Sequence, residues 1–411
     1  MNILYIHNDY GKPSGEEHAA EEIAGLLIEK SHSVWWYRRS SAELYRSSIG
    51  ALKGFCTGIH NPASAAALDR LLQERRPDVV LVQNIYPLIS PSIFDVLRRR
   101  RLAVVMRCPN YRLVCPSGLH FTGREVCERC LGRGREWWCL WRNCEGRYLK
   151  SAGYALRNAV ARIRGSIVNS VHVFLVQSGF QKAKFVESGI PAERIEILPG
   201  IVRPEPSAGE VELGDVVAYV GRISPEKGIR EFVEAARRAP EIPFVVAGDC
   251  EAARALRAGA PANVQWLGFL DRDALRRLYA RSRMIVVPSL CYEGFPNVLV
   301  QAMSLGKPVV CSAIGGLPEI IGYGAAGLLA EAGNVEELAS RIRALYFRPE
   351  LCRKLGRAGR ERAEQEYSRE RAFERLMQAF QKALRQRADR GASDDSTPLR
   401  RTTCRSLCGT T

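Results

Sequence analysis

The stretch VVAYVGRISPEKGIREFVEAARRA (216–239) decides the fold. It opens with a short apolar run typical of a buried strand, and apolar residues return at helical spacing after Gly228. A strand that passes through a glycine-containing loop into a helix is the repeating unit of α/β folds with parallel sheets. Further strands are expected at FVVAG (244–248), VQWLGF (264–269), MIVVPS (284–289) and PVVCSA (308–313).

The first half of the chain has the same pattern. NILYIHN (2–8) predicts a buried strand and EEHAAEEIAGLLIEK (16–30) a helix, joined by a loop with two glycines and a proline. Later strand candidates are SVWWYR (33–38), VVLVQN (79–84), AVVMR (103–107) and VHVFLVQ (171–177). A linker rich in Pro, Gly and acidic residues lies at 199–214. We therefore expect two Rossmann-like domains that face each other across a cleft, where open α/β sheets bind ligands.

Composition limits the class of protein. The chain has 411 residues, of which 46% are hydrophobic and 25% charged, and a formal net charge of +16. This excess of positive charge favours an anionic partner such as a nucleotide, a nucleic acid or an acidic membrane. No run approaches the roughly 18 apolar residues of a membrane span, and the N-terminus lacks the pattern of a signal peptide. We therefore expect a cytoplasmic protein whose 13 cysteines are mostly reduced.

The first motif with chemical meaning is GRISPEKG (221–228), directly after a predicted strand. Gly221 and Gly228 allow a tight turn and close approach of the backbone to a ligand. Arg222 and Lys227 place two cations at the top of the sheet, and such a pair suits a diphosphate. Taken alone, the motif would more readily be a surface turn with solvated charges.

The second motif is PSLCYEGFPNVLVQAMSLGKPVVCS (288–312), which predicts strand, loop, helix and strand. Glu293 lies in the loop, where its carboxylate can accept hydrogen bonds from sugar hydroxyls. The helix starts near Asn297, and its first N–H groups favour an anion. Gln301 follows about one turn later, where a helix amide satisfied by its neighbours is the alternative.

Together these motifs resemble glycosyltransferase family 4, the retaining group 1 glycosyltransferases of the GT-B fold. The resemblance covers most of residues 1–385 and rests on the order of GRISPEKG, AGD (247–249), LGF (267–269), VPS (287–289), YEGFPNVLVQAMSLGKPVV and IGGLPEII (314–321). It implies that Arg222 and Lys227 hold the diphosphate of a UDP- or GDP-type nucleotide-sugar donor. It also implies that Glu293 contacts the donor sugar, and that Gly15, Gly221, Gly294, Phe295, Asn297 and Gln301 line the donor site.

The resemblance also gives each part of the chain a role. Residues 1–200 become an acceptor domain with a Cys-rich insert at 108–146, and residues 201–368 become the donor domain. A helix at 369–387 is expected to pack back toward the N-terminal domain, and the polar tail 388–411 is expected to be disordered. The implied function is transfer of a sugar to a polysaccharide or lipid-linked saccharide, with no cofactor required for catalysis.

Two positions depart from the family pattern. Gln301 stands where the second Glu of a Glu-x7-Glu motif receives the nucleotide ribose, which costs roughly 1 kcal/mol of charge-assisted hydrogen bonding. Pro109, in RCPNYRLVCPSG (107–118), stands where related members carry an active-site His. His7 or His120 could compensate, although a packing histidine is the simpler interpretation of each.

Three other functions compete with this one. An epimerase on the same scaffold would need several histidines and carboxylates facing the sugar, and the 6 His of the chain offer no such set. A non-catalytic binder of nucleotide or carbohydrate would explain Pro109 and Gln301 together. An RNA-binding protein would leave the diphosphate motif unexplained, so we expect no nucleic-acid partner.

The insert carries a cysteine cluster and, after it, a basic helix. Cys127 and Cys130 have metal-knuckle spacing. The resemblance favours a structural zinc on Cys115, Cys127, Cys130 and Cys144, and scattered reduced thiols are the equal alternative. RYLKSAGYALRNAVARIRG (147–165), preceded by three tryptophans, predicts a basic amphipathic helix. It fits docking on the anionic inner face of the plasma membrane or an ordinary core-facing helix, and less well nucleic-acid stacking.

Overall fold

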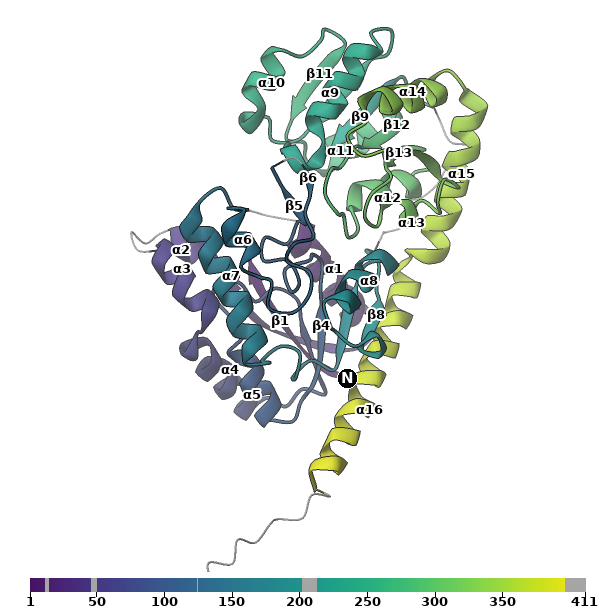
Figure 1. The fold of residues 1–411 in the computed structure, drawn as a ribbon. Coiled ribbons are helices and arrows are strands. Elements are labelled where there is room, and N and C mark those ends of the chain that lie inside the picture. The colour runs from purple at the N-terminus through teal and green to yellow at the C-terminus, as the bar shows by residue number, and fades with distance from the viewer. Residues whose placement is uncertain (12–14, 46–49, 124, 202–212, 396–411) are drawn as a thin grey trace, which may run out of the picture.

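The computed structural model describes residues 1–11, 15–45, 50–123, 125–201 and 213–395. Figure 1 shows two α/β domains, one above the other, with the C-terminal helix running along the lower one. This architecture confirms the predicted fold class of two parallel-sheet domains. The predicted linker lies largely outside the described residues, as do residues 12–14 of the first loop and residues 396–411.

A six-stranded parallel sheet, in the order β2-β1-β3-β4-β7-β8, forms the N-terminal domain. The sheet consists of β1 (Asn2–Asp9), β2 (Ser33–Ser40), β3 (Val79–Val82), β4 (Ala103–Arg107), β7 (Val173–Val176) and β8 (Ile195–Ile197). The helices around it are α1 (Gly15–Glu29), α2 (Ala42–Tyr45), α3 (Gly50–Ile59), α4 (Pro62–Glu74), α5 (Ile93–Arg99), α7 (Tyr148–Ile163), α8 (Gly179–Glu187) and the 3-10 turn η1 (Ala192–Arg194). The insert adds β5 (Phe121–Thr122), β6 (Glu125–Val126) and α6 (Trp138–Trp141). Because the order of the strands reverses beside β1, a crevice opens there at the carboxyl ends of the strands.

The C-terminal domain repeats this plan with a second six-stranded parallel sheet, in the order β11-β10-β9-β12-β13-β14. Its strands are β9 (Val216–Val220), β10 (Phe244–Ala247), β11 (Val264–Gly268), β12 (Ser282–Val287), β13 (Val309–Ser312) and β14 (Gly327–Ala330). Its helices are η2 (Pro225–Lys227), α9 (Ile229–Arg238), η3 (Glu251–Ala253), α10 (Arg254–Ala258), α11 (Arg272–Arg281), α12 (Asn297–Ser304), α13 (Leu317–Ile320), α14 (Val335–Tyr346) and α15 (Pro349–Glu366). The order of the strands reverses beside β9, which lies in the middle of the sheet. Arg222 and Lys227 follow this strand and therefore lie where such sheets bind ligands.

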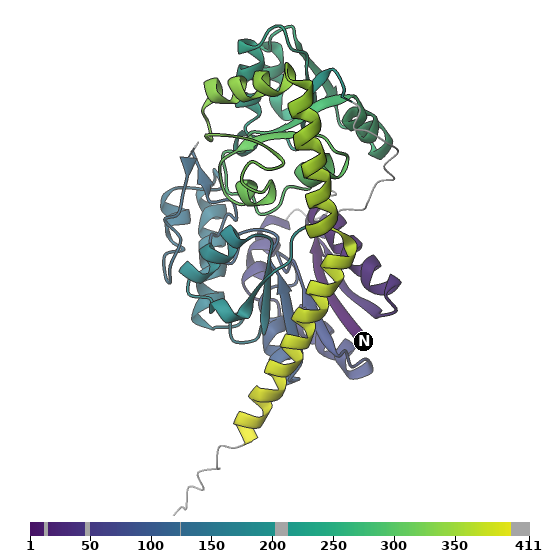
Figure 2. The ribbon, with the colours of Figure 1, turned by 90° about the vertical axis from the view of Figure 1, so that its right-hand side faces the viewer.

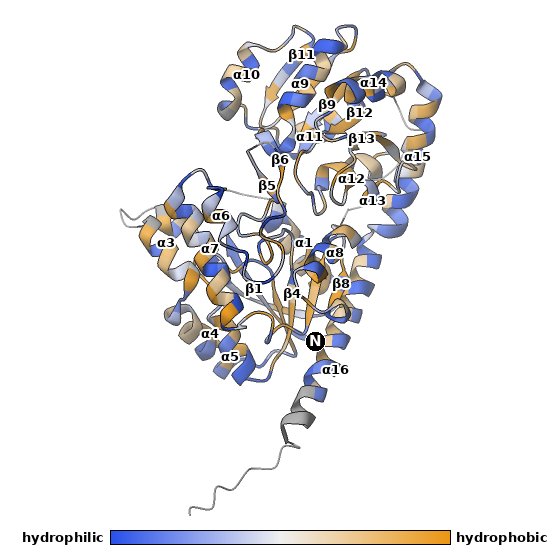
Figure 3. Cartoon of the chain, in the orientation of Figure 1, coloured by the Kyte–Doolittle hydropathy of each residue, from blue (hydrophilic) through white to orange (hydrophobic). Residues whose placement is uncertain are grey.

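Burial explains why the strand sequences are almost continuously apolar. The residues of β3, β4, β7 and β10 are buried along their whole length, as expected for parallel strands covered by helices on both faces. Figure 3 shows hydrophobic colours on the strands, mixed colours on the helices beside them and mainly hydrophilic colours along α15 and α16. No helix in the described part of the chain has the length and apolar character needed to cross a bilayer.

The last helix, α16 (Arg369–Asp395), ties the chain end to the N-terminal domain. Leu376 and Phe380 are fully buried on the face of α16 that packs against β3, β4 and β7, and Lys382 forms an ion pair with Glu196 of β8. Figure 2 shows α15 on the upper domain and α16 on the lower one. The helix continues to Asp395, past the predicted end at residue 387, because a docked helix can extend by one hydrogen bond per added residue.

Candidate active site

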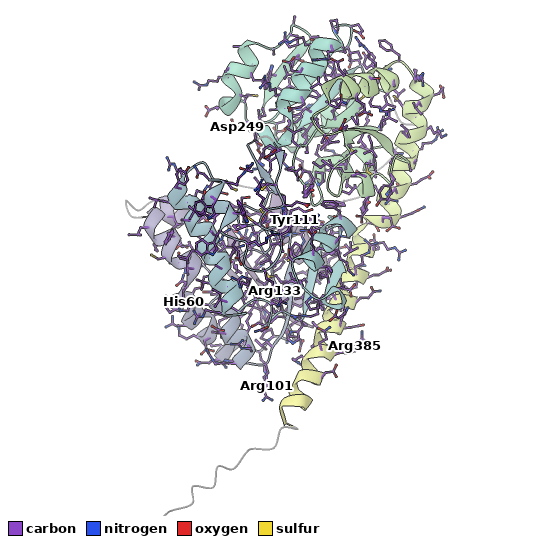
Figure 4. The ribbon with its side chains drawn as sticks, viewed as in Figure 1. His60, Arg101, Tyr111, Arg133, Asp249 and Arg385 are labelled. Carbon is purple, nitrogen blue, oxygen red and sulfur yellow. The ribbon has the colours of Figure 1, made fainter. Side chains whose placement is uncertain are left out.

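The two domains touch through side chains at the carboxyl ends of their sheets. The Glu319 carboxylate of α13 accepts hydrogen bonds from the backbone N–H groups of Gly179 and Phe180, at 2.8 and 3.2 Å. It thereby caps the N-terminus of α8 in the other domain, where a negative charge is favourable. The Tyr292 hydroxyl donates to Glu128 of the insert at 2.8 Å, and its ring lies near that of Tyr111, which Figure 4 labels between the domains.

The turn after β9 brings the diphosphate-motif cations to this edge. Gly228 has a φ of +70°, and a Cβ there would stand 1.8 Å from the Pro288 carbonyl oxygen, so the turn requires glycine. The side chain of Arg222 is 69% exposed, with Nη2 3.5 Å from Glu226 Oε1. Lys227 points inward, and its Nζ lies 2.5 Å from Glu293 Oε1.

Lys227 and Glu293 form a buried ion pair. Glu293 is only 7% exposed, and Oε1 also accepts a hydrogen bond from Ser289 Oγ at 2.7 Å. Burial by itself raises the pKa of Glu293, but the attraction and hydrogen bond of Lys227, the Ser289 bond and the charge of Arg222 leave the pKa lowered. Glu293 is therefore an ionised carboxylate at neutral pH, held in one orientation.

The loop after Glu293 meets the N-terminal domain. A Cβ on Gly15, at the start of α1, would stand 3.7 Å from Asn297 Nδ2 at the start of α12. The Gln177 amide, at the end of β7, lies 2.6 Å from the place of a Cβ on Gly294. Phe295 is buried against Gly200 of the other domain. Predicted donor-site residues from both domains thus converge on the first turn of α12.

Gln301 lies on the exposed side of α12, one turn after Asn297. Its Oε1 accepts a hydrogen bond from the Tyr279 hydroxyl at 3.2 Å. The amide oxygen is therefore already engaged by a neighbour, and a ribose hydroxyl would have to share it.

The histidines suggested as replacements for the missing one are both packed inside the N-terminal domain. His7 is fully buried at the end of β1, with Nε2 3.6 Å from Asp9, and burial lowers its pKa to about 4. His120 is also buried, with Nδ1 3.0 Å from the Cys127 carbonyl and its ring against Tyr111. Neutral imidazoles in such surroundings match the simpler interpretation, that of packing residues.

Sequence reasoning missed a concavity beside the crevice of the N-terminal domain. It offers about 20 Å³ of space, room for about one water molecule, and opens to solvent. Its lining includes Glu16 of α1, Gln83 after β3, Arg107 at the end of β4, Pro109 and Asn110. The signal that could have found it is a polar residue that directly follows a buried apolar strand, as at Gln83 and Arg107.

The predicted zinc ligands gather in the insert. Cys130, Cys139 and Cys144 share one packing cluster, and burial, followed by the neighbouring thiols Cys115, Cys144 and Cys127, raises the pKa of Cys130. All described cysteines are free thiols. Within the described ranges, no three His, Cys, Asp or Glu side chains are arranged to hold a metal ion. The thiols as placed do not fit a four-coordinate zinc, and the structural zinc stays a prediction from the sequence.

Comparisons with known proteins agree with this fold. Residues 206–362 match the family described as "Glycosyl transferases group 1", and residues 30–200 match the "Glycosyl transferase 4-like domain". The "D-inositol 3-phosphate glycosyltransferase" of Segniliparus rotundus is 30% identical over 217 residues, which are 47% of this chain and 48% of that protein. The chain thus spans about half the length of this curated relative.

Two solved structures share the fold. The "Sucrose-phosphate synthase" of Thermosynechococcus elongatus has a TM-score of 0.69 and 17% identity, over 94% of this chain and 99% of that one. The Anabaena "Alr3699/HepE in complex with UDP and glucose" has a TM-score of 0.62 and 18% identity, over 92% and 99%.

Proposed function

The chain belongs to the group 1 glycosyltransferases, and on that premise we propose that it transfers a sugar from a nucleotide-sugar donor to a saccharide acceptor with retention of configuration. The observation that carries the proposal is the Lys227–Glu293 pair, held at the crevice opposite Gly15 and Gln177. A buried carboxylate beside two cations can accept sugar hydroxyls while the cations meet a diphosphate.

In this proposal the two domains share the donor. Arg222 and Lys227 bind the diphosphate, and the N–H groups at the start of α12 add positive potential. Glu293 accepts hydroxyls of the sugar, with the backbone of Gly294 and Phe295 beside it. A donor of the UDP or GDP type is supported by the similar HepE structure, which contains UDP.

The reaction needs no nucleophile from the protein. The acceptor hydroxyl attacks the anomeric carbon from the face that the diphosphate leaves, and the bond between that carbon and the phosphate oxygen breaks. The acceptor proton passes to the departing phosphate oxygen, which makes the absence of a histidine at Pro109 tolerable. The main catalytic contribution is stabilisation of the developing diphosphate charge by Arg222 and Lys227.

A thermal-shift screen against UDP-, GDP- and ADP-sugars tests the proposal and identifies the nucleotide. We expect the sugars of one of these nucleotides to raise the melting temperature of the wild type, with a much smaller rise for Lys227→Ala. Donor consumption with a saccharide acceptor then separates a transferase from the non-catalytic binder. Conversion of the donor sugar to its epimer without acceptor would indicate the epimerase instead.

We also propose that the acceptor is presented at an anionic membrane surface. An apolar rim on the N-terminal domain consists of Leu52 and Phe55 on α3, Trp141 on α6, and Tyr148 and Leu149 at the start of α7. Trp141 is 77% and Leu149 85% exposed. The rim is continuous, because the Phe55 ring lies against Gly153 of α7.

Exposed cations flank this rim. Lys53 on α3, Arg147 just before α7 and Lys150, which also pairs with Glu145, alternate with its apolar residues. This is the pattern of a surface that enters the headgroup region of anionic lipids. Flotation with vesicles of phosphatidylcholine and roughly one third phosphatidylglycerol, an anionic lipid, should recover the wild type. A Trp141→Ser/Leu149→Ser variant should stay at the bottom of the gradient. Phe269→Ser, at an 84% exposed site in the other domain, is the control and should float. Flotation of all three proteins alike would refute the proposed surface.

A further inference from the structure

A tyrosine of the C-terminal domain is packed on the N-terminal domain. Tyr292 immediately precedes Glu293 in the loop after β12, yet its ring packs against the hydrophobic core of the N-terminal domain. The Phe180 ring meets it in a T-shaped arrangement at a centroid distance of 4.7 Å, and the His120 ring lies 5.6 Å away. The residue next to the proposed sugar-binding carboxylate is thus held by the other domain.

The Tyr292 hydroxyl is bonded to a carboxylate of the Cys-rich insert. It donates to Glu128 Oε1 at 2.8 Å, and Nζ of Lys184 on α8 lies 2.5 Å from the same oxygen. Burial alone raises the pKa of Glu128, but the bonds from Lys184 and Tyr292 leave that pKa lowered, so the carboxylate is ionised at neutral pH. Tyr292 is therefore tied to the insert by a charge-assisted hydrogen bond, which is stronger than one between neutral groups.

The backbone of the insert holds Glu128 in place. Glu128 follows the β5–β6 hairpin, which Figure 1 shows rising from the N-terminal domain toward the C-terminal one. The preceding residue, Cys127, donates its N–H to the His120 carbonyl at 2.8 Å, and its own carbonyl oxygen lies 3.0 Å from His120 Nδ1. The Glu128 carbonyl accepts the N–H of Leu131 at 2.9 Å. The carboxylate thus projects from a hydrogen-bonded turn.

Contacts inside the C-terminal domain do not fix this loop relative to the N-terminal domain. The Glu293 carbonyl accepts the Gly316 N–H at 3.0 Å, and the ion pair with Lys227 holds the carboxylate, but all three residues belong to one domain. The bond from Tyr292 to Glu128 adds a directional link to the other domain.

We propose that Glu128 is a positioning residue for the donor sugar, which holds the loop of Glu293 against the N-terminal domain through the Tyr292 hydroxyl. The insert thus contributes to transfer without touching a substrate. Position matters here because a displacement of about 1 Å in a reacting site can cost roughly 100-fold in rate. The hold on the loop follows from the contacts, whereas its effect on transfer rests on the proposed function.

The first test needs no activity and follows hydrogen exchange at the loop. Because the Gly316 N–H donates to the Glu293 carbonyl, a peptide that contains Gly316 reports how firmly the loop is held. Exchange is measured by mass spectrometry on the full chain. We expect it to be about three- to tenfold faster in Glu128→Ala and in Tyr292→Phe, each of which removes the same hydrogen bond.

Glu187→Ala is the matched control. Glu187 pairs with the same Lys184, at 3.1 Å, while the Tyr292 hydroxyl is bonded to Glu128. Exchange at Gly316 should therefore be unchanged in this variant. Equal exchange in all four proteins, or an equal increase in Glu187→Ala and Glu128→Ala, would overturn the proposal.

The second test measures turnover with donor and acceptor. Glu128→Ala and Tyr292→Phe should each lower kcat about tenfold, while the Kd of the free nucleotide stays within about twofold, because the diphosphate cations lie in the other domain from Glu128. A variant that only destabilised the fold would lose turnover and nucleotide binding together, and that result would overturn the positioning role. Glu187→Ala should keep the turnover of the wild type.

Two further variants show whether the hydrogen bond is the link. The double variant Glu128→Ala/Tyr292→Phe should also lose about tenfold in kcat, because both changes remove one interaction. A loss near 100-fold would mean two independent effects and would overturn the proposal. Glu128→Gln offers an amide oxygen to the Tyr292 hydroxyl and should recover most of the turnover. A loss equal to that of Glu128→Ala would overturn the role of this bond.

The two tests also separate this proposal from the proposed function. Absence of transfer by the wild type would count against the proposed function, while hydrogen exchange would still decide whether Glu128 holds the loop. Faster exchange together with an unchanged kcat would overturn the positioning role and leave the proposed function intact.

Discussion

Replacing Lys227 by Met should destabilise the C-terminal domain through Glu293. Met keeps the length of the side chain but removes the cation 2.5 Å from the Glu293 carboxylate, which is left with Ser289 as its hydrogen-bond partner. Leaving a fully buried charge unpaired costs about 3–5 kcal/mol. The Lys227 side chain is 22% exposed, so water can reach part of the pair, and we expect about 2–3 kcal/mol. That corresponds to a fall of roughly 5–10 °C in melting temperature for a domain of this size.

The pH dependence of the destabilisation by Lys227→Met shows whether the unpaired charge of Glu293 causes it. In the wild type the pKa of Glu293 lies below its usual range, so the pair stabilises the fold above that range and loses this effect as pH falls. Without Lys227, burial dominates and raises the pKa of Glu293 above its unfolded value. At low pH Glu293 of the variant is protonated, and no unpaired charge is buried when the variant folds. As pH rises, Glu293 must ionise without a partner, and the variant loses stability. The destabilisation by Lys227→Met should therefore be small near pH 4 and complete at pH 7.

Calorimetry and urea unfolding between pH 4 and 8 measure both effects. Lys227→Arg should retain most of the stability because it keeps the charge, and Glu293→Gln added to Lys227→Met should restore most of it. Arg353→Met, which breaks the exposed pair with Glu350, is the control and should cost less than about 1 kcal/mol. A loss in Lys227→Met that equals this control, or that does not change with pH, would refute the reasoning.

Further predictions concern donor binding, acid stability and metal content. Arg222→Ala should lower turnover at least about 100-fold in a donor-consumption assay, since it removes a charge that stabilises the leaving group. Gln301→Glu should tighten nucleotide binding about fivefold in calorimetric titration, through a charge-assisted hydrogen bond. Because His7 binds a proton more readily unfolded than folded, the wild type should lose about 3 kcal/mol relative to His7→Gln between pH 7 and pH 4, measured by urea unfolding. A structural zinc would appear as about one equivalent in metal analysis of the purified protein, and less than half an equivalent would end that prediction.

The strand–turn–helix units were predictable because they depend on local sequence. Short apolar runs bounded by glycine turns give buried parallel strands wherever helices cover both faces. The turn at Gly228 also follows from local chemistry, because its positive φ favours glycine. The sequence could therefore place Lys227 at the carboxyl edge of the sheet.

The pairings across the chain could not be predicted in the same way. Lys227 and Glu293 are separated by 66 positions, and their contact depends on how two loops pack. In the sequence Arg107 is only the end of an apolar strand, since no local pattern shows that the amides of Gln83 and Gln177 accept its hydrogen bonds. The spacing of Cys127 and Cys130 likewise suggests a metal site, but it does not show in which directions the thiols point.

The contact between the domains links the loop after Glu293 to the end of β7 in the N-terminal sheet. A Cβ on Gly294 would collide with the Gln177 amide, and a Cβ on Gly200 would stand 2.4 Å from the Phe295 ring, so side chains at these positions would hold the domains apart. Gln177 in turn contacts Arg107. The Gln177 side chain therefore joins the loop after Glu293 to the buried end of β4. Because these contacts and that of Gly15 with Asn297 all join the two domains, separation of the domains would break them together.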